Sequence, residues 1–420
     1  MKIVFITPGS GDGYYCGNCF RDNLQAQALL RAGHDVIVVP LYLPLKYIGA
    51  LQGNAPLSFP ATTYYVEQKI AGRPVASWLK RMLGTPSLLR LAAGMSGTTS
   101  ASGMEEMTLD MIQGDSTVFD GHLQQLASWL ETECPDIIQL SSTLVLGVAK
   151  GLKERLSIPI VCSLQDEEVW IDSLDAPTAA RAWRAIAENS VYIDRFITTS
   201  RFYRDQMRLR LPTLPIAEVI YPGIETGRYA TSKWPEDPTI GFFYRMNRLD
   251  GLDILAEAFV LLKQRGTVPR LKLRIGGGYM QPDKSFLREV KRTLHPYLSD
   301  VTFEENYSWE HHADFYRKIT VLSVPLRFTE SVGIYLCEAF AAGRPAVEPA
   351  TGSFPEILGD AGIAYSPNNA HTLADALEKL LTDPECLSTC SANARHLSKN
   401  RYNDELTASQ LLHVYRDLRN

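Results

Sequence analysis

Two glutamates in the stretch "ESVGIYLCE" have the spacing of a two-point ligand site, with seven residues between Glu330 and Glu338. Glu330 is predicted to lie in a loop that leaves a buried strand, and Glu338 on the helix that follows. A fully helical stretch would separate the two carboxylates by about 12 Å along the axis. This is too far for a carboxylate pair that acts on one bond, but it suits contacts with two ends of an elongated ligand. Backbone amides at the helix start, residues 331–334, would suit a phosphate between those ends. A sugar nucleotide, with ribose, diphosphate and hexose in a row, has this layout.

A second stretch, "GYYCGNCFRD", follows the first apolar run and carries Cys16 and Cys19 as a C-x-x-C. A zinc site would need two further ligands, and no second C-x-x-C or spaced histidine pair completes the set. The glycines around the cysteines would let the backbone approach a ligand closely, with helix-start amides facing an anion. We therefore favour a glycine-rich ligand loop over a redox or metal device, with Cys19 as a small packed residue.

Acidic residues gather in "QDEEVWID", which follows a predicted strand and contains Asp166, Glu167, Glu168 and Asp172. Such a cluster could bind a cation or position an acceptor. The interpretation we favour is a solvated loop that carries one or two ligand-binding residues.

Strands and helices alternate along the chain, which predicts βαβ units and parallel sheets with ligand sites at the carboxyl ends of the strands. Strands are predicted at residues 2–7, 35–42, 136–140, 158–164, 195–200, 239–245, 271–278 and 319–325. Helices are predicted at residues 24–34, 143–156, 252–266, 333–343 and 371–383.

A chain of 420 residues is expected to form two domains. The polar, proline-bearing segment "TSKWPEDP" marks a linker, after which the alternation of strands and helices starts again. We predict a first domain at residues 1–222, a second at 223–403, and a last helix at 404–418 that packs back on the first. Two Rossmann-like α/β/α domains would then face each other across a cleft, a natural place for a ligand.

Composition and charge limit the partners and the cellular compartment that we expect. The formal net charge of −5 and the pI near 6.0 do not favour nucleic acid as a partner. The opening "MKIVFITPG" does not look like a secretory signal, and no stretch has membrane-spanning length, so we expect a cytoplasmic protein. Seven cysteines, an odd number in a long chain, fit reduced thiols.

An insertion between residues 50 and 120 breaks the alternation. Within residues 69–91, basic residues are mixed with tryptophan, methionine and leucine; they are Lys69, Arg73, Lys80, Arg81 and Arg90. Such a segment can lie on an anionic membrane surface or bind an acidic or lipid-linked acceptor. The alternative, which we favour, is a helical pair packed on the domain with a solvated basic face.

These motifs occur in the order found in a known family. The E-x7-E, "EAFAAGRP" and "GSFPEI" resemble the donor site of the retaining GT-B glycosyltransferases of family 4, the glycosyl transferases group 1. The resemblance extends over nearly the whole chain through "RAGHDVIVV", "CPDIIQL", "IPIVCSLQD", "YIDRFITTS", "IYPGIE" and "GFFYRMNRLDGLDILAEAF". It implies the GT-B architecture and retaining transfer of a hexose-type sugar from a nucleotide diphosphate sugar to a hydroxyl acceptor, without a metal.

The resemblance also implies roles for individual residues. Glu330 would bind hydroxyls of the donor sugar and Glu338 the nucleotide ribose. Arg245 would neutralise the leaving diphosphate, which the loop glycine Gly17 would also face. The diphosphate would meet the backbone of Ser331, Val332, Gly333 and Ile334. On the acceptor side we name Asp166, Lys80 and Arg81.

Two positions depart from the family pattern. The family usually has a lysine where this chain has Asp250, which removes a charge-assisted contact worth about 1.5–3 kcal/mol. Arg248 could supply the missing charge, or Asp250 could pair with Arg248 on the surface. Gln165 replaces a common histidine; it can donate a hydrogen bond to a sugar hydroxyl but cannot carry a proton near neutral pH.

The departures leave two alternatives to a transferase: a catalytically weak or inactive sugar-nucleotide-binding pseudoenzyme, and a GT-B-fold epimerase. If the chain is a transferase, the acceptor hydroxyl would attack from the side of the departing diphosphate, whose oxygen takes the proton. The acceptor is a sugar, a lipid-linked sugar or a small molecule. The sequence does not name the base, the hexose or the acceptor.

Overall fold

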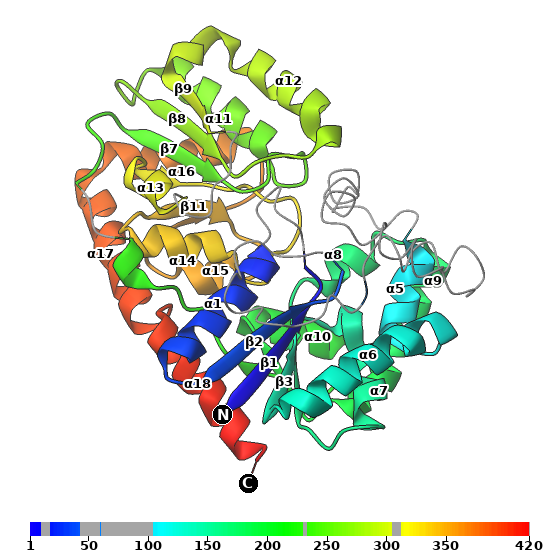
Figure 1. Ribbon diagram of the computed structural model, residues 1–420. Coiled ribbons are helices and arrows are strands. Elements are labelled where there is room, and N and C mark those ends of the chain that lie inside the picture. The colour runs from blue at the N-terminus through cyan, green and yellow to red at the C-terminus, as the bar shows by residue number, and fades with distance from the viewer. Residues whose placement is uncertain (10–16, 43–58, 60–103, 230–232, 305–311, 420) are drawn as a thin grey trace. The chain divides into compact units, whose positions relative to one another are not determined.

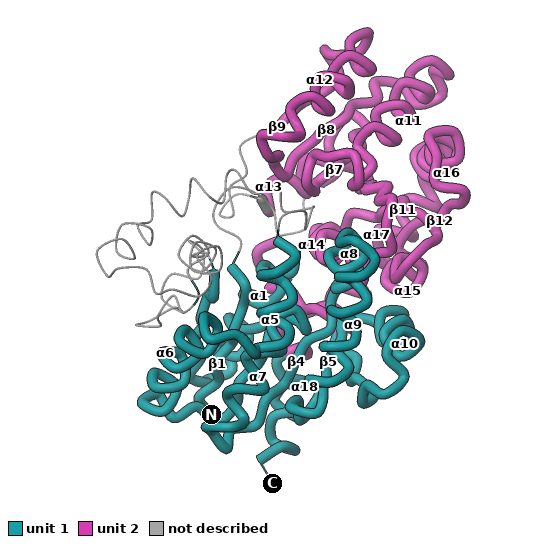
Figure 2. Tube along the Cα trace, turned by 90° about the vertical axis from the view of Figure 1, so that its right-hand side faces the viewer, with its two compact units in different colours: residues 1–12, 18–220, 408–420 teal, residues 13–17, 221–407 magenta. Residues whose placement is uncertain are grey.

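The computed structural model describes residues 1–9, 17–42, 59, 104–229, 233–304 and 312–419 (Figure 1). The chain divides into two compact units, coloured separately in Figure 2. Unit 1 comprises residues 1–12, 18–220 and 408–420, and unit 2 comprises residues 13–17 and 221–407. The division after Ile220 lies two residues before the boundary we predicted at 222.

Unit 1 is built on a six-stranded parallel sheet with the order β2-β1-β3-β4-β5-β6. The strands are β1 (Lys2–Thr7), β2 (Asp35–Pro40), β3 (Ile137–Leu140), β4 (Ile160–Leu164), β5 (Arg195–Thr198) and β6 (Glu218–Val219). Residues of β3 and β4 are buried throughout, as expected for central strands with helices on both faces.

The helices of unit 1 begin and end at recognisable residues. They are α1 (Gly17–Arg31), α5 (Glu105–Gln113), α6 (Thr117–Glu133), α7 (Leu146–Lys153), α8 (Glu167–Ile171), α9 (Ala176–Asn189) and α10 (Arg201–Arg210), with 3₁₀ turns η2 (Thr143–Val145) and η3 (Ser190–Tyr192). Ser116, Asp175 and Ser200 cap α6, α9 and α10 by accepting a backbone N–H three residues on. The predicted helix over 24–34 is the second half of α1, which begins at the glycine-rich stretch.

Unit 2 repeats the architecture with the sheet order β12-β11-β10-β7-β8-β9, again parallel. Its strands are β7 (Thr239–Phe243), β8 (Lys272–Gly276), β9 (Val301–Glu304), β10 (Val321–Leu322), β11 (Ala346–Pro349) and β12 (Gly362–Tyr365). Its helices are α11 (Leu252–Arg265), α12 (Lys284–Thr293), α13 (His312–Arg317), α14 (Ile334–Ala341), α15 (Phe354–Leu358), α16 (Ala370–Thr382) and α17 (Pro384–Asn400), with 3₁₀ turns η4 (Thr226–Arg228), η5 (Gln281–Asp283) and η6 (His295–Asp300).

The last helix, α18 (Asp404–Asp417), crosses the division, because residues from 408 onward cluster with unit 1. Its Tyr415 is fully buried in unit 1, where the hydroxyl donates to Gln139 Oε1 on β3. A buried tyrosine whose hydroxyl finds an acceptor contributes both apolar area and a specific anchor.

The strand orders locate the ligand-binding edges. In unit 2 the order reverses between β7 and β10, and in unit 1 between β1 and β3. Ligands of open parallel sheets bind outside the carboxyl ends of the strands at such switch points. In the described part of the chain, no helix combines the length and apolarity needed to cross a bilayer.

Candidate active site

Arg245 stands at the carboxyl end of β7, on a loop that is bonded to the end of β8. The Tyr244 N–H donates to Gly276 O at 3.2 Å, and the Met246 N–H to Gly278 O at 2.9 Å. Gly277 (φ +116°) makes this approach possible, since a Cβ there would lie 2.0 Å from Tyr244 O. The Arg245 guanidinium lies 5.3 Å from the centroid of the Tyr244 ring. The glycine run "GGG" therefore fixes the backbone from which Arg245 projects.

Asp250 is fully buried at the end of the same loop and pairs with Arg245. The carboxylate lies 3.3 Å from Arg245 Nε through Oδ2 and 3.4 Å from Nη2 through Oδ1. Burial raises the pKa of Asp250 to about 7, against the lowering effect of Arg245 and with a further raising effect of Glu330.

The surface pairing of Asp250 with Arg248 that we considered is wrong. The Arg248 side chain is 57% exposed, and it pairs with Asp253 at 3.3 Å and with Glu289. Arg248 therefore already has acidic partners on the surface, and its predicted part in donor binding stays a prediction.

Glu330 lies beyond β10, the strand next to β7, and its backbone is held by the "GSFPEI" segment. The Ser353 N–H donates to Glu330 O at 3.0 Å. Gly352 (φ +60°) packs against the same peptide, because a Cβ there would lie 2.9 Å from Glu330 N. The side chain of Glu330 is buried and accepts a bond from the Tyr244 hydroxyl at 3.3 Å. Tyr244 thus contacts both Arg245 and Glu330, which the structure brings together at the switch point.

The start of α14 is buried beside Glu330. Gly333 precedes the helix in the left-handed conformation (φ +61°), and no side chain caps it. Among the described residues, the backbone N–H groups of Val332, Gly333 and Ile334 show no hydrogen-bond acceptor. First-turn amides lack intrahelical acceptors and therefore suit an anion. The E-x7-E stretch is helical only from Ile334 onward, so the fully helical spacing of the two carboxylates does not apply.

Glu338 lies on α14 and is completely enclosed. Its Oε1 accepts from the Tyr229 hydroxyl at 2.5 Å and its Oε2 from the Tyr316 hydroxyl at 2.8 Å. The sequence did not point to these tyrosines, which come from segments on either side of β7. A ribose hydroxyl that reached this carboxylate would exchange one O–H donor for another.

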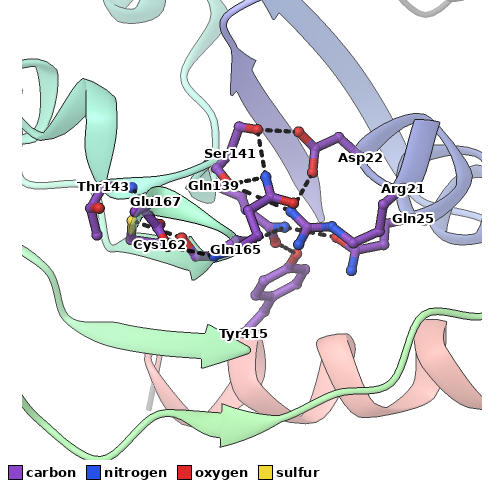
Figure 3. A network of polar contacts seen from close by, with 11 residues as sticks. Arg21, Asp22, Gln25, Gln139, Ser141, Thr143, Cys162, Gln165, Glu167 and Tyr415 are labelled. Atoms are coloured by element: carbon purple, nitrogen blue, oxygen red, sulfur yellow. Dashed lines mark hydrogen bonds and ion pairs between the residues drawn. The ribbon is translucent and has the colours of Figure 1, made fainter. Parts of the chain in front are cut away.

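In unit 1, Gln165 belongs to a polar network at the ends of β3 and β4, drawn in Figure 3. Its Nε2 donates to Ser141 O at 2.6 Å and to Ser141 Oγ at 3.1 Å. The Ser141 hydroxyl donates to Asp22, which pairs with Arg21 at 2.7 Å. The Gln165 side chain is buried, and its Oε1 has no hydrogen-bond partner in the described chain. The Gln165 amide nitrogen thus bonds Ser141 here, and its predicted hydrogen bond to a sugar hydroxyl stays a prediction.

Glu167 extends the network and is fully buried. Its carboxylate accepts from the Thr143 N–H at 3.1 Å, the Gln165 N–H at 2.8 Å and the Tyr203 hydroxyl at 2.6 Å. Burial raises the pKa of the neighbouring Glu168 to about 7. The solvated loop that we favoured for this stretch is therefore wrong for Glu167. Within the described residues, no group of three acidic, histidine or cysteine side chains is placed to hold a metal.

The remaining predicted residues fall in different places. Asp166 precedes α8 in the left-handed conformation (φ +53°), uncommon for a non-glycine residue. Gly17 begins α1, and Cys19 is buried in its first turn. Lys80 and Arg81 lie outside the described residues, so the membrane and acceptor hypotheses for residues 69–91 stay predictions.

The sequence analysis did not identify Arg21 and Asp22, although they form a charged pair on a helix whose other buried residues are largely apolar, which was the available signal.

Comparison with solved structures shows that the chain has the GT-B fold, as we predicted. Sucrose-phosphate synthase from Thermosynechococcus elongatus is 17% identical with a TM-score of 0.69, covering 100% of this chain and 99% of that one. HepE from Anabaena, solved with UDP, is 15% identical with a TM-score of 0.68, covering 99% and 100%. HepE solved with UDP-glucose is 14% identical, with a TM-score of 0.67 and the same coverage.

Sequence comparison finds similarity to a family of glycosyltransferases. Residues 237–383, which include Arg245, Glu330 and Glu338, match the family model of the glycosyl transferases group 1. A D-inositol 3-phosphate glycosyltransferase from Rhodococcus erythropolis is 31% identical over 218 residues, 47% of this chain and 48% of that protein. One from Streptomyces bingchenggensis is 27% identical over 292 residues, 62% of each. The chain thus spans about half to under two thirds of the length of these curated relatives.

Proposed function

We propose that the chain is a retaining, metal-independent glycosyltransferase that moves a hexose-type sugar from a nucleotide diphosphate sugar to a hydroxyl acceptor. The observation that carries the proposal is the convergence of Arg245 and Glu330 at the switch point of unit 2, beside the buried start of α14. The matches to glycosyl transferases group 1 and to HepE with UDP-glucose support a sugar nucleotide as the donor.

In this proposal each end of the donor meets a different group. The guanidinium of Arg245 and the amides of residues 332–334 hold the diphosphate, and Glu330 accepts hydrogen bonds from the sugar hydroxyls. Glu338 binds the ribose after Tyr229 or Tyr316 gives up its bond to the carboxylate. This exchange replaces one hydroxyl donor with another, so the buried carboxylate stays satisfied.

Transfer needs no side-chain base. The acceptor hydroxyl attacks the anomeric carbon from the face of the leaving diphosphate, and a phosphate oxygen of the leaving group takes its proton. Arg245 and the helix amides stabilise the charge that develops on the diphosphate. On the acceptor side, a hydrogen bond between the Gln165 amide and an acceptor hydroxyl would orient a sugar or small-molecule acceptor without removing its proton.

The experiment measures release of the nucleoside diphosphate from UDP-glucose, UDP-N-acetylglucosamine, GDP-mannose and ADP-glucose, with and without sugar acceptors. Arg245→Ala and Glu330→Ala should each lower the rate by about 10²–10³-fold, the usual cost of losing an electrostatic contact to the transition state. Excess EDTA should leave the rate unchanged, and the product should keep the anomeric configuration of the donor.

Arg270→Ala is the matched control, because Arg270 is an exposed arginine of unit 2 that pairs only with Glu236 and Asp237 among the contacts described. Its rate should equal that of the unmodified chain. Full turnover in Arg245→Ala and Glu330→Ala would contradict the proposed site.

The Arg245–Asp250 pair also supports a second candidate function. An acid that already holds the leaving-group arginine would suit a protein that binds a sugar nucleotide without turning it over. Tight binding of one nucleotide sugar with no release of diphosphate under any acceptor would favour this sugar-nucleotide-binding pseudoenzyme.

A further inference from the structure

The Arg245–Asp250 pair has the geometry of a contact that can be exchanged. Its distances of 3.3 and 3.4 Å exceed the roughly 2.7–2.9 Å of a strong charge-assisted hydrogen bond. The Oδ2 atom of Asp250 accepts no hydrogen bond within the described residues, so its contact with Arg245 is only the longer ion pair. Arg245 is 21% exposed, whereas Asp250 has no exposed surface. The guanidinium therefore has a solvent-facing side, and the acid lies beneath it.

The backbone keeps Asp250 in this position whether or not Arg245 moves. The Asp250 N–H donates to Asn247 Oδ1 at 3.0 Å. The next residue, Gly251 (φ +76°), packs so closely that a Cβ would lie 1.9 Å from Pro325 O. The backbone that carries Asp250 is therefore fixed by contacts that do not involve Arg245.

The charged groups that face Asp250 in the described chain are Arg245, Glu330 and Asp283. Glu330 lies on the loop after β10, and Asp283 ends η5, where it accepts the Met280 N–H at 3.0 Å. Two of these three groups are acids and one is a cation. Any ligand that draws the cation away leaves a buried carboxylate among other acids, which is unfavourable unless it is protonated.

Resting on the proposed function, we propose that Asp250 is a positioning residue that holds Arg245 until the donor arrives. When the donor diphosphate takes over the guanidinium, the Asp250 carboxylate takes up one proton from solvent. The donor gains an ion pair with Arg245, and the acid becomes neutral, so charge and protons balance. Binding is thereby linked to pH through Asp250.

The sign of the linkage follows from the pKa of about 7 before binding and a higher pKa once Arg245 has turned to the donor. Below about pH 6 Asp250 is protonated in both states, so donor affinity is independent of pH. As pH rises above about 7, the ionised acid competes for Arg245 and affinity falls, by at most tenfold per pH unit for one proton.

The test is titration calorimetry of the full chain with whichever of the four nucleotide sugars binds. Their phosphates are diesters with a fixed charge near neutral pH, so proton uptake reports on the protein. In two buffers with different ionisation heats at about pH 7.5, we expect uptake approaching one proton per donor. The dissociation constant should rise roughly tenfold between about pH 7 and pH 8.5.

Asp250→Asn keeps the shape and one acceptor for Arg245 but cannot take up a proton. It should bind the donor with no proton uptake, and with an affinity that stays constant over the same pH range. Asp283→Asn removes a second titratable acid that faces Arg245, leaves Glu330 in place, and should keep the uptake. Asp253→Asn, which removes a surface partner of Arg248, should also keep it.

The outcomes separate the two proposals. Donor binding without proton uptake by the unmodified chain would overturn the role of Asp250 and leave the proposed function standing. Uptake that survives in Asp250→Asn and disappears in Asp283→Asn would overturn it as well. If none of the four nucleotide sugars binds at any pH, the proposed function fails first and the role of Asp250 with it. Should Asp250→Asn not fold, the absence of uptake by the unmodified chain, or its loss in Asp283→Asn, would still overturn the role of Asp250.

Discussion

The two units place polar clusters at equivalent edges of two similar parallel sheets, yet the clusters differ in the kinds of group that bond them. In unit 1, Glu167 accepts three hydrogen bonds of 2.6–3.1 Å, two of them from backbone N–H groups. In unit 2, Arg245 and Glu330 make contacts of 3.3–3.4 Å with neighbouring side chains, and Glu338 accepts two tyrosine hydroxyls at 2.5 and 2.8 Å. Unit 1 therefore holds its cluster through the backbone, whereas unit 2 holds its cluster through side chains that can rotate.

The comparison indicates which cluster has a structural role and which is suited to a ligand. Bonds from backbone amides cannot be surrendered without moving the strand ends that carry them. Bonds from tyrosine hydroxyls and a guanidinium can be replaced by hydroxyls and phosphates of a sugar nucleotide at little cost. The carboxylates of unit 2 are thus bonded by tyrosine hydroxyls and a guanidinium. The proposed donor would supply hydroxyls in place of the former and phosphates that bind the latter.

The largest effect should come from breaking the cluster of unit 1. Glu167→Ala would leave the buried N–H groups of Thr143 and Gln165 without their acceptor, each costing about 1–3 kcal/mol, whereas the Tyr203 hydroxyl keeps Glu168 as an acceptor. We expect the free energy of unfolding to fall by about 2–6 kcal/mol, measured by urea denaturation followed by circular dichroism. Glu188→Ala, at an exposed position of α9, is the control and should change it by less than about 0.5 kcal/mol. A Glu167→Ala variant as stable as this control would show that the network is not structural.

A smaller effect should come from loosening the cluster of unit 2. Tyr316→Phe removes the hydroxyl that bonds Glu338 Oε2 and should cost about 1 kcal/mol in the free energy of unfolding. Because the carboxylate is then open to a ribose hydroxyl, the dissociation constant of the nucleotide sugar should fall about threefold to tenfold. Calorimetric titration measures this change.

Tyr297→Phe provides the control, since Tyr297 is a tyrosine of unit 2 that packs against Phe259 on α11. Its donor affinity should match that of the unmodified chain. Weaker binding in Tyr316→Phe would mean that the hydroxyl positions Glu338 for the ribose instead of competing with it.

Sequence patterns predicted the elements whose apolar runs are long and buried. β1, β4, β7 and α11 fall inside or next to the predicted ranges, and α11 ends at Arg265 with Gly266 as its C-cap. Three strands of unit 2, β9, β11 and β12, were not predicted. Two of them, β9 and β12, are four-residue edge strands with mostly half-exposed side chains, so they lack the apolar run that marks a central strand.

The partners of the site residues were less predictable than the residues themselves. The loop position of Glu330 and the helical position of Glu338 follow from local pattern. Tyr229 is 109 residues from Glu338 in the chain, and no local pattern connects them. Arg245 and Arg248 both lie within five residues of Asp250, so sequence spacing does not show which of them pairs with the acid. The loop conformation decides in favour of Arg245.

The smallest effect should separate the two arginines of the β7 loop. Arg248→Ala removes a side chain that already contacts Asp253, Glu289 and the Phe286 ring on the surface. Exposed pairs of this kind contribute little, so donor affinity should change by less than about threefold. In Asp250→Asn, where Arg245 loses its acidic partner, the same Arg248→Ala change should remain as small. A loss of tenfold or more in either background would show that Arg248 leaves Glu289 and supplies a positive charge to the diphosphate. Both arginines of the β7 loop would then bind the diphosphate, and the ligand-exchanging cluster of unit 2 would extend to the surface.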